Sequence, residues 1–188
     1  KADWLNGRLR TNLAAFRTDF EDLQVELLDD VSLTLIVANA ADALIQGVEF
    51  EVKARATHWL TLSASGSLID AEYREYTDPL RGTSYDGHRI QRTPEYQFTL
   101  GGDVDLPITD KLNFIASANY TYQDQMYWGP ENTNSESGYG ILNGRMGVSS
   151  VDGRWSLTVW GRNMNNELYR TSVIPFAGDE VSLFGAPK

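Results

Sequence analysis

Apolar and polar residues alternate along most of this chain with a period of two. Between residues 112 and 122 the even positions carry apolar or aromatic side chains, and every odd position except Ile115 is polar. The same alternation runs through residues 46–56, 60–68 and 95–106. Because successive side chains of a β-strand point to opposite faces, these four segments are predicted to be strands with one apolar and one hydrophilic face.

Shorter alternating segments extend the pattern toward both ends of the chain. Residues 142–148 and 155–159 are predicted strands, and residues 9–20 form a less regular one. The partner of this first strand is expected around residues 23–38, within which residues 31–37 fit either a loop or a fully buried strand. The predicted fold class is therefore all-β, an antiparallel up-and-down meander of about eight strands.

The connections between these strands differ in length in a regular way. Short turns are predicted at residues 57–58, 107–110 and 151–154, and the last contains an Asp-Gly pair that favours a type I′ hairpin. Long polar links lie between them, at residues 77–90 and 129–138. Short turns at one end and long loops at the other are typical of a barrel with a periplasmic and an extracellular rim. The meander is thus predicted to be part of a larger transmembrane β-barrel.

A soluble sandwich also alternates, so the pattern alone does not say whether the apolar faces meet lipid or a protein core. Three features favour lipid. The strands run to about ten residues or more, their polar faces are continuous, and their apolar faces include small residues such as Ala116, Ala118 and Gly102. Aromatic residues near the strand ends suit interfacial girdles, although strands are rich in aromatics in general. These aromatics are Trp59, Tyr96, Tyr120, Tyr122, Tyr127, Trp128 and Trp155.

Composition narrows the classes of function. The 26 acidic and 16 basic side chains give a net charge of −10, which would repel a phosphate backbone, so no nucleic acid is expected as a partner. The chain has no cysteine, which removes disulfides and thiolate chemistry. No run of about 18 apolar residues occurs, so a helical membrane span is not predicted. Residues 1–7 lack the layout of a secretory signal, which predicts a mature form or a fragment.

No catalytic, metal or cofactor site is predicted. Glu49 and Glu51 share a face, but their alternation with Lys53 and Arg55 is typical of a solvated wall and not of an acid–base pair. A lone loop histidine such as His88 is more often solvent-exposed than a metal ligand. The chain is therefore not expected to be an enzyme.

Several segments resemble the landmarks of one family in their usual order. Residues 37–51, VANAADALIQGVEFE, resemble the N-A-x-x-A-x-x-x-G-V-E-x-E segment in the barrel of TonB-dependent receptors. Later segments are similar to landmarks that follow in the same family, and the last resembles the G-x-P-R that introduces the final strand. These segments are residues 70–73, 92–95, 160–169 and 185–188. The chain is thus identified as similar to the C-terminal barrel portion of a TonB-dependent outer-membrane receptor.

The resemblance implies that residues 1–188 are a partial barrel domain, with the plug domain, the TonB box and the final strand absent. Such barrels have about 22 strands, so the chain would hold roughly the last third. The family's usual role is uptake of a ferric siderophore, cobalamin or an oligosaccharide across the outer membrane of a Gram-negative bacterium. The partners implied are outer-membrane lipid, an extracellular nutrient ligand, and the TonB complex through the missing plug.

Ligand selection in this family rests on extracellular loops, so the contact candidates lie in and beside the two long links. They are Tyr85, Asp86, His88, Trp128, Glu131, Asn132 and Asn134. Two other hypotheses compete with the receptor. One is a self-contained small β-barrel that binds a ligand without a transport role, and the other is a secreted β-rich adhesion or carbohydrate-binding module.

Overall fold

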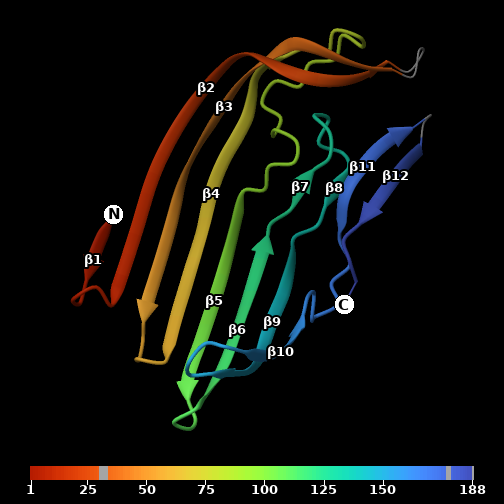
Figure 1. Ribbon diagram of the computed structural model, residues 1–188. Helices are drawn as coiled ribbons and strands as arrows, with labels where there is room; N and C mark the ends of the chain where they lie inside the picture. The colour runs from red at the N-terminus through yellow and green to blue at the C-terminus, as the bar shows by residue number, and fades with distance from the viewer. Residues whose placement is uncertain (30–33, 177–178, 188) are drawn as a thin grey trace.

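The computed structural model describes residues 1–29, 34–176 and 179–187, and no helix occurs among them. Eight antiparallel strands form one sheet in the order β1-β2-β3-β4-β5-β6-β9-β10 (Figure 1). This confirms the predicted all-β antiparallel meander. The strands are β1 (Ala2–Trp4), β2 (Leu9–Asp29), β3 (Thr34–Arg55), β4 (Leu60–Tyr76), β5 (Tyr96–Pro107), β6 (Leu112–Gln123), β9 (Tyr139–Ser150) and β10 (Ser156–Gly161).

Two small antiparallel sheets stand apart from the main one. The first pairs β7 (Met126–Tyr127) with β8 (Ser135–Glu136), and the second pairs β11 (Arg170–Phe176) with β12 (Asp179–Phe184). Figure 1 shows both near the upper end of the main sheet, where the long links between strands also lie. The short turns gather at the opposite, lower end. The two rims expected from the loop lengths are therefore present.

The first hairpin differs from the prediction. Residues 23–38 do not form a separate partner strand, because Leu23–Asp29 continue β2 and pair with the first part of β3. The pairing slips between Phe20 and Leu23, where Asp22 takes a positive φ of 54°. Such a bulge adds unpaired residues and interrupts the alternation while the strand continues. The interrupted alternation is why one strand was predicted as two. Of the ambiguous residues 31–37, residues 34–37 begin β3 and residues 31–33 lie outside the described part of the chain.

The short turns close through side chains as well as through the backbone. Thr57 Oγ1 accepts the N–H groups of Trp59 and Leu60, and Thr109 Oγ1 accepts those of Lys111 and Leu112 in the next lower turn. Serine and threonine favour turns through bonds of this kind. The same local chemistry therefore closes two successive hairpins of the sheet.

The predicted type I′ turn at residues 151–154 is wrong. A type I′ turn needs a positive φ at both central residues, but here only Gly153 has one, at 70°. The Gly153 N–H instead donates to the Ser150 carbonyl, and Ser150 N donates to the Trp155 carbonyl, which gives a longer loop. Hairpin loops of this length are most often built around a type I turn.

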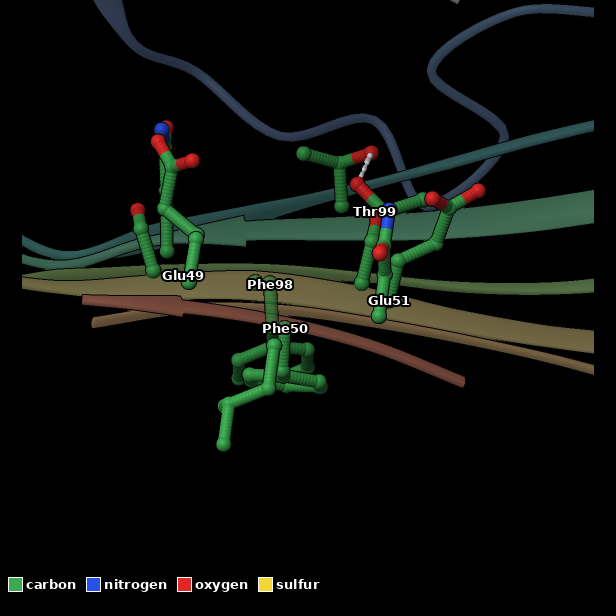
Figure 2. Close-up of a pocket in the computed structure, with 13 residues that line it drawn as sticks. Glu49, Phe50, Glu51, Phe98 and Thr99 are labelled. Carbon is green, nitrogen blue, oxygen red and sulfur yellow. Dashed lines mark hydrogen bonds between the residues drawn. The ribbon is translucent and has the colours of Figure 1, made fainter. Parts of the chain in front are cut away.

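The two faces of the sheet follow the predicted alternation. Strand register aligns Phe50, Gly66 and Phe98 in neighbouring strands on one face, while Glu49 aligns with Ser67 on the other. Figure 2 shows Phe50 and Phe98 on one side of the strands, with Glu49, Glu51 and Thr99 on the opposite side, toward which the later strands curve. The apolar residues therefore lie on the convex face and the polar residues on the concave face.

Both faces change character at one level of β3 and β4. On the convex face Val48 is followed by Gln46, whose amide donates to Asp70 at 2.9 Å. On the concave face the pair of Glu49 and Ser67 is followed, three pairs further up, by the pair of Ala43 and Tyr73, which are buried. Residues 43–55 of β3 pair with residues 61–73 of β4 without a bulge, so the exchange is one of sequence and not of register. Above this level the convex face suits water and the concave face supports a packed core.

Aromatic side chains mark the same level on the convex face. The rings of Phe98 and Tyr122 lie 5.4 Å apart, and those of Tyr96 and Tyr122 lie 5.8 Å apart. Phe50 lies over Gly66, where an added Cβ would come within 2.8 Å of its ring. Large amphipathic rings at the end of an apolar band are the pattern of an interfacial girdle.

Candidate functional site

Above the aromatic level, link 77–90 packs on the concave side of β3 and β4 as a small core. The rings of Tyr73 and Tyr76 lie 4.9 Å apart, Tyr85 follows at 5.3 Å from Tyr76, and His88 follows at 5.6 Å from Tyr85. Val25, from the extended β2 hairpin, belongs to the same buried cluster. Two of the predicted contact residues, Tyr85 and His88, thus belong to one row of contacting rings, each tilted by 51° against the next.

Two carboxylates, the buried Asp78 and the exposed Asp86, hold the backbone of this link. Asp78 is only 1% exposed, accepts the N–H groups of Leu80 and Arg81, and pairs with the Arg81 guanidinium at 3.2 Å. Asp86 Oδ1 accepts the backbone N–H of Tyr76 at 2.7 Å. Burial raises the pKa of Tyr85, and the charge of Asp78 raises it further, so the phenol stays protonated at neutral pH. Asp86, predicted as a ligand contact, therefore serves the fold of the link.

The two long links brace each other directly. Asn132 accepts the N–H of Arg89 at 2.8 Å and donates to the Arg89 carbonyl at 3.0 Å. His88 Nδ1 lies 2.8 Å from the Pro130 carbonyl oxygen. Asn132 and His88 were both predicted from their place in polar loops. The Asn132 amide and the His88 Nδ1 atom instead contact the backbone of the opposite link.

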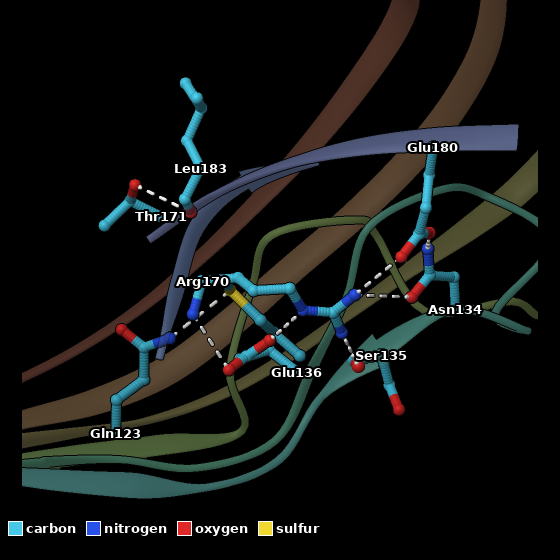
Figure 3. A network of polar contacts seen from close by, with 9 residues as sticks. Gln123, Asn134, Ser135, Glu136, Arg170, Thr171, Glu180 and Leu183 are labelled. Atoms are coloured by element: carbon cyan, nitrogen blue, oxygen red, sulfur yellow. Dashed lines mark hydrogen bonds and ion pairs between the residues drawn. The ribbon is translucent and has the colours of Figure 1, made fainter. Parts of the chain in front are cut away.

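Arg170 fixes link 129–138 to the β11–β12 hairpin (Figure 3). Its guanidinium pairs with Glu136 at 2.6 Å and with Glu180 at 3.2 Å, and it lies over the Trp128 ring at 5.8 Å. Asn134 bonds both Arg170 and Glu180. The side chains of Arg170 and Glu136 are only 20% and 12% exposed, so this is a largely desolvated network. Sequence reasoning missed Arg170, because its partners lie 34 and 10 residues away.

Trp128 differs from its prediction as a girdle residue. It is 8% exposed and packs with Met126 and Val173, so it belongs to a second small core and does not face the convex side. Its indole Nε1 is buried without a hydrogen-bond partner among the described residues. A buried donor without an acceptor is costly and needs an explanation.

A cavity of about 1150 Å³ lies between these elements. The β2 hairpin, the two long links and the β11–β12 hairpin each contribute to its lining. Four of the seven predicted contact residues line it, namely Tyr85, Trp128, Glu131 and Asn134. The other three, Asp86, His88 and Asn132, hold the links in place behind it. The cavity therefore brings together residues that lie about 150 positions apart in the sequence, as Leu23 and Ile174 do.

A second hollow of about 550 Å³ lies against the sheet itself and contains the acidic pair considered above (Figure 2). Glu49 and Glu51 are exposed there beside Ser65, Thr99 and Asn12. Thr99 shares a hydrogen bond with Thr121 across the strands at 3.0 Å. This is the solvated wall expected from the alternation.

Within the described ranges, no group of three or more His, Asp or Glu side chains is arranged to hold a metal ion. No helix in the described part of the chain is long and apolar enough to cross a membrane.

Comparison with known proteins gives one family and one fold. The sequence model of the family described as TonB dependent receptor-like, beta-barrel matches residues 1–164. The ferric yersiniabactin uptake receptor FyuA from Yersinia pestis superposes with a TM-score of 0.79 and 21% identity over 97% of this chain. The siderophore receptor PiuA from Acinetobacter baumannii gives 0.74 and 20% identity over 98% of the chain.

A third structure, the ferric preacinetobactin receptor BauA from Acinetobacter baumannii, gives a TM-score of 0.66 and 21% identity over 97% of the chain. This chain spans 26%, 25% and 26% of the lengths of FyuA, PiuA and BauA. At these identities the likeness establishes the arrangement of strands.

Proposed function

Because the chain belongs to the family of TonB-dependent receptor-like β-barrels, we propose that it forms part of the wall and of the ligand cavity of an outer-membrane import receptor. Members of this family are receptors and transporters, not enzymes. The chain spans about a quarter of the receptors it resembles, so uptake is an activity of the whole receptor.

The observation that carries the proposal is the exchange of character between the two faces of the sheet. On β6 the apolar set runs from Leu112 to Tyr122. Ten steps of about 3.3 Å, tilted by about 40°, span roughly 25 Å, the height of the apolar band of an outer-membrane barrel. Above that height the convex face turns polar and the concave side holds the packed links. A sheet that meets lipid only up to that level explains both changes.

The strand order of the sheet does not support the alternative hypothesis of a self-contained small barrel. A self-contained barrel needs its first and last strands to pair, because closure removes both edges. In the described sheet β1 and β10 lie at the two ends of the strand order. An open, curved sheet with an apolar convex face fits a segment of a larger barrel better.

The cavity supports a ligand at the end opposite the short turns. We assign contact roles to Tyr85, Trp128, Glu131 and Asn134, because these predicted residues line it. Ferric siderophores are the proposed substrate class, ahead of cobalamin and oligosaccharides, since FyuA and BauA are described as a ferric yersiniabactin uptake receptor and a ferric preacinetobactin receptor. The remaining proposed partners are outer-membrane lipid and the TonB complex, engaged through a plug domain. The proposed location is the outer membrane of a Gram-negative bacterium.

Uptake of radiolabelled iron tests this proposal. The gene for the full-length receptor is deleted, and transport of a panel of ferric siderophores is measured in the deletion strain with and without the gene restored. We expect at least one complex whose uptake needs both the receptor and TonB, with the receptor in the outer-membrane fraction. Iron uptake that is unchanged by the deletion for every complex, together with restored uptake of cobalamin or an oligosaccharide, would refute the siderophore assignment.

A further inference from the structure

Among the four carboxylates that line the 1150 Å³ cavity, Glu131 has the fewest partners. It lies in the link between β7 and β8, is half-buried, and folds back over Gly129, where an added Cβ would collide with its carboxylate. Among the described residues, no hydrogen bond or ion pair reaches this carboxylate. A partly desolvated carboxylate without a partner favours binding of a cation, because the ion pair replaces the hydration that burial removes.

The other three carboxylates of the cavity each have a partner. Asp78 pairs with Arg81 at 3.2 Å, and Glu180 pairs with Arg170 at 3.2 Å. Asp179 accepts the backbone N–H of Glu180. The lining contains four carboxylates, from Asp78, Glu131, Asp179 and Glu180, against two guanidinium groups, from Arg81 and Arg92, and a third, from Arg170, lies beside it and pairs with Glu180. The field inside the described part of the cavity is therefore negative, which disfavours a polyanionic ligand.

Trp128 supplies a second, independent sign of a ligand. It lines the same cavity, is 8% exposed, and its Nε1 has no acceptor among the described residues. An indole N–H can only donate, so the group it lacks is an oxygen acceptor. Arg170 covers the face of its ring, which leaves the edge of the ring for other contacts. Tyr85 adds a further ring to the same wall, and aromatic rings beside a carboxylate suit organic cations.

We propose that the cavity selects ferric complexes whose periphery carries a primary ammonium group and a nearby amide-type carbonyl. The ammonium pairs with the Glu131 carboxylate, and the carbonyl oxygen accepts the Nε1–H of Trp128. The inference rests on the proposed function and narrows its substrate class.

Two matched probes separate these contacts. One is a linear ferric trihydroxamate with a single free ammonium group, and the other is the same complex with that amine acetylated. A ferric tricatecholate serves as a polyanionic third probe. Binding of each to the purified full-length receptor is measured by isothermal titration, for the wild type and for E131Q, W128F and the control E21Q. Glu21 is exposed on β2 and does not line the cavity, so E21Q removes the same charge elsewhere.

We expect the wild type to bind the ammonium complex about tenfold or more tightly than the acetylated one, the range of a hydrogen-bonded charge pair. E131Q should remove that preference and leave the affinity for the acetylated complex within about twofold. W128F should weaken both trihydroxamates several-fold, and E21Q should change neither. Equal binding of the two trihydroxamates, tighter binding of the tricatecholate, or a preference that survives E131Q overturns the inference while the receptor assignment stands. Failure of the wild type to bind any of the three complexes counts against the inference and the siderophore assignment together.

Discussion

The wall of the sheet and the cavity above it are built on different principles. In the wall, Leu100 and Thr99 are assigned to opposite faces by their position alone, because a strand alternates every residue. In the cavity, Tyr85, Trp128 and Glu131 meet only because links from distant parts of the chain fold against each other. The local sequence therefore determines the structure of the wall, whereas contacts between segments that are distant in the sequence determine the structure of the cavity. Substitutions should affect the two regions in different ways.

The largest expected effect is a charge on the convex face of the wall. Leu100 lies near the middle of the apolar set of β5 and is half exposed there. Leu100→Arg should lower the free energy of unfolding from a bilayer by about 2–4 kcal/mol, the cost of an arginine near the midplane. Thr99→Arg, on the concave face, should cost clearly less, with loss of the hydrogen bond to Thr121 as its main penalty.

Reversible denaturant titration of the full-length receptor in lipid vesicles measures both variants. Equal losses at positions 99 and 100 would mean that the convex face does not meet lipid. The difference between the two variants is the quantity that matters, since it cancels the general effect of adding an arginine.

The next effect concerns the network that joins the cavity links. Arg170→Met leaves the Glu136 carboxylate, 12% exposed, without its cation. We expect the local stability of residues 129–138 to fall by about 2–3 kcal/mol, since removal of one partner strands a desolvated charge. Hydrogen exchange measures this opening. Adding Glu136→Gln to the Arg170 variant should recover part of the loss, because the stranded charge is then removed.

Arg154→Met is the matched control in the wall. Its ion pair with Asp152 is 83% and 53% exposed, and such surface pairs contribute about 0–1 kcal/mol. If the two arginine variants open residues 129–138 to the same extent, Arg170 does not hold the link.

The difference between local alternation and backbone geometry explains which strand predictions were confirmed and which were wrong. Strands β5 and β6 were placed to within one residue, because their alternation is unbroken. The prediction failed at residues 23–38, where the bulge beside Asp22 interrupts the period, and at Gly153, where loop length overrode the Asp-Gly preference. Each failure lies where backbone geometry, not polarity, decides the structure.

The candidate site was predicted only in part. Loop position identified the region, and four of the seven chosen residues line the cavity. Loop position could not separate the residues that line the cavity from those that hold the links together. Asn132 and Glu131 are polar neighbours in the sequence, but Asn132 bonds the opposite link and Glu131 lines the cavity. Arg170 carries no local signal at all. Its role depends on Glu136 and Glu180, which only the tertiary fold brings to it.

A smaller effect should appear at high pH and only in the cavity links. Burial, followed by the charges of Asp78 and Glu131, raises the pKa of Tyr85 above its ordinary value of 10.0. The folded state thus holds this proton more tightly than the unfolded state does. The stabilisation is fully present below pH 10 and is lost as the pH rises through the higher folded pKa. The protection factors of residues 77–90, which correct for base-catalysed exchange, should fall in that window. Tyr85→Phe should reduce this fall without removing it, because burial also raises the pKa values of Tyr73 and Tyr76 in the same cluster.

The smallest effect compares one substitution in both regions. Gly153 in the wall turn and Gly87 in the cavity link have φ values of 70° and 73°, and neither has an atom within 4 Å of an added Cβ. Alanine at either position should therefore cost only the left-handed backbone, about 1 kcal/mol. Gly153→Ala should lower the global stability, because the β9–β10 hairpin belongs to the main sheet. Gly87→Ala should instead appear only as faster exchange in residues 77–90, because surface links open independently of the strands that carry them. If Gly87→Ala lowered the global stability as much as Gly153→Ala, wall and cavity would unfold as one unit. The two regions would then differ in how the sequence determines their structure but not in their stability.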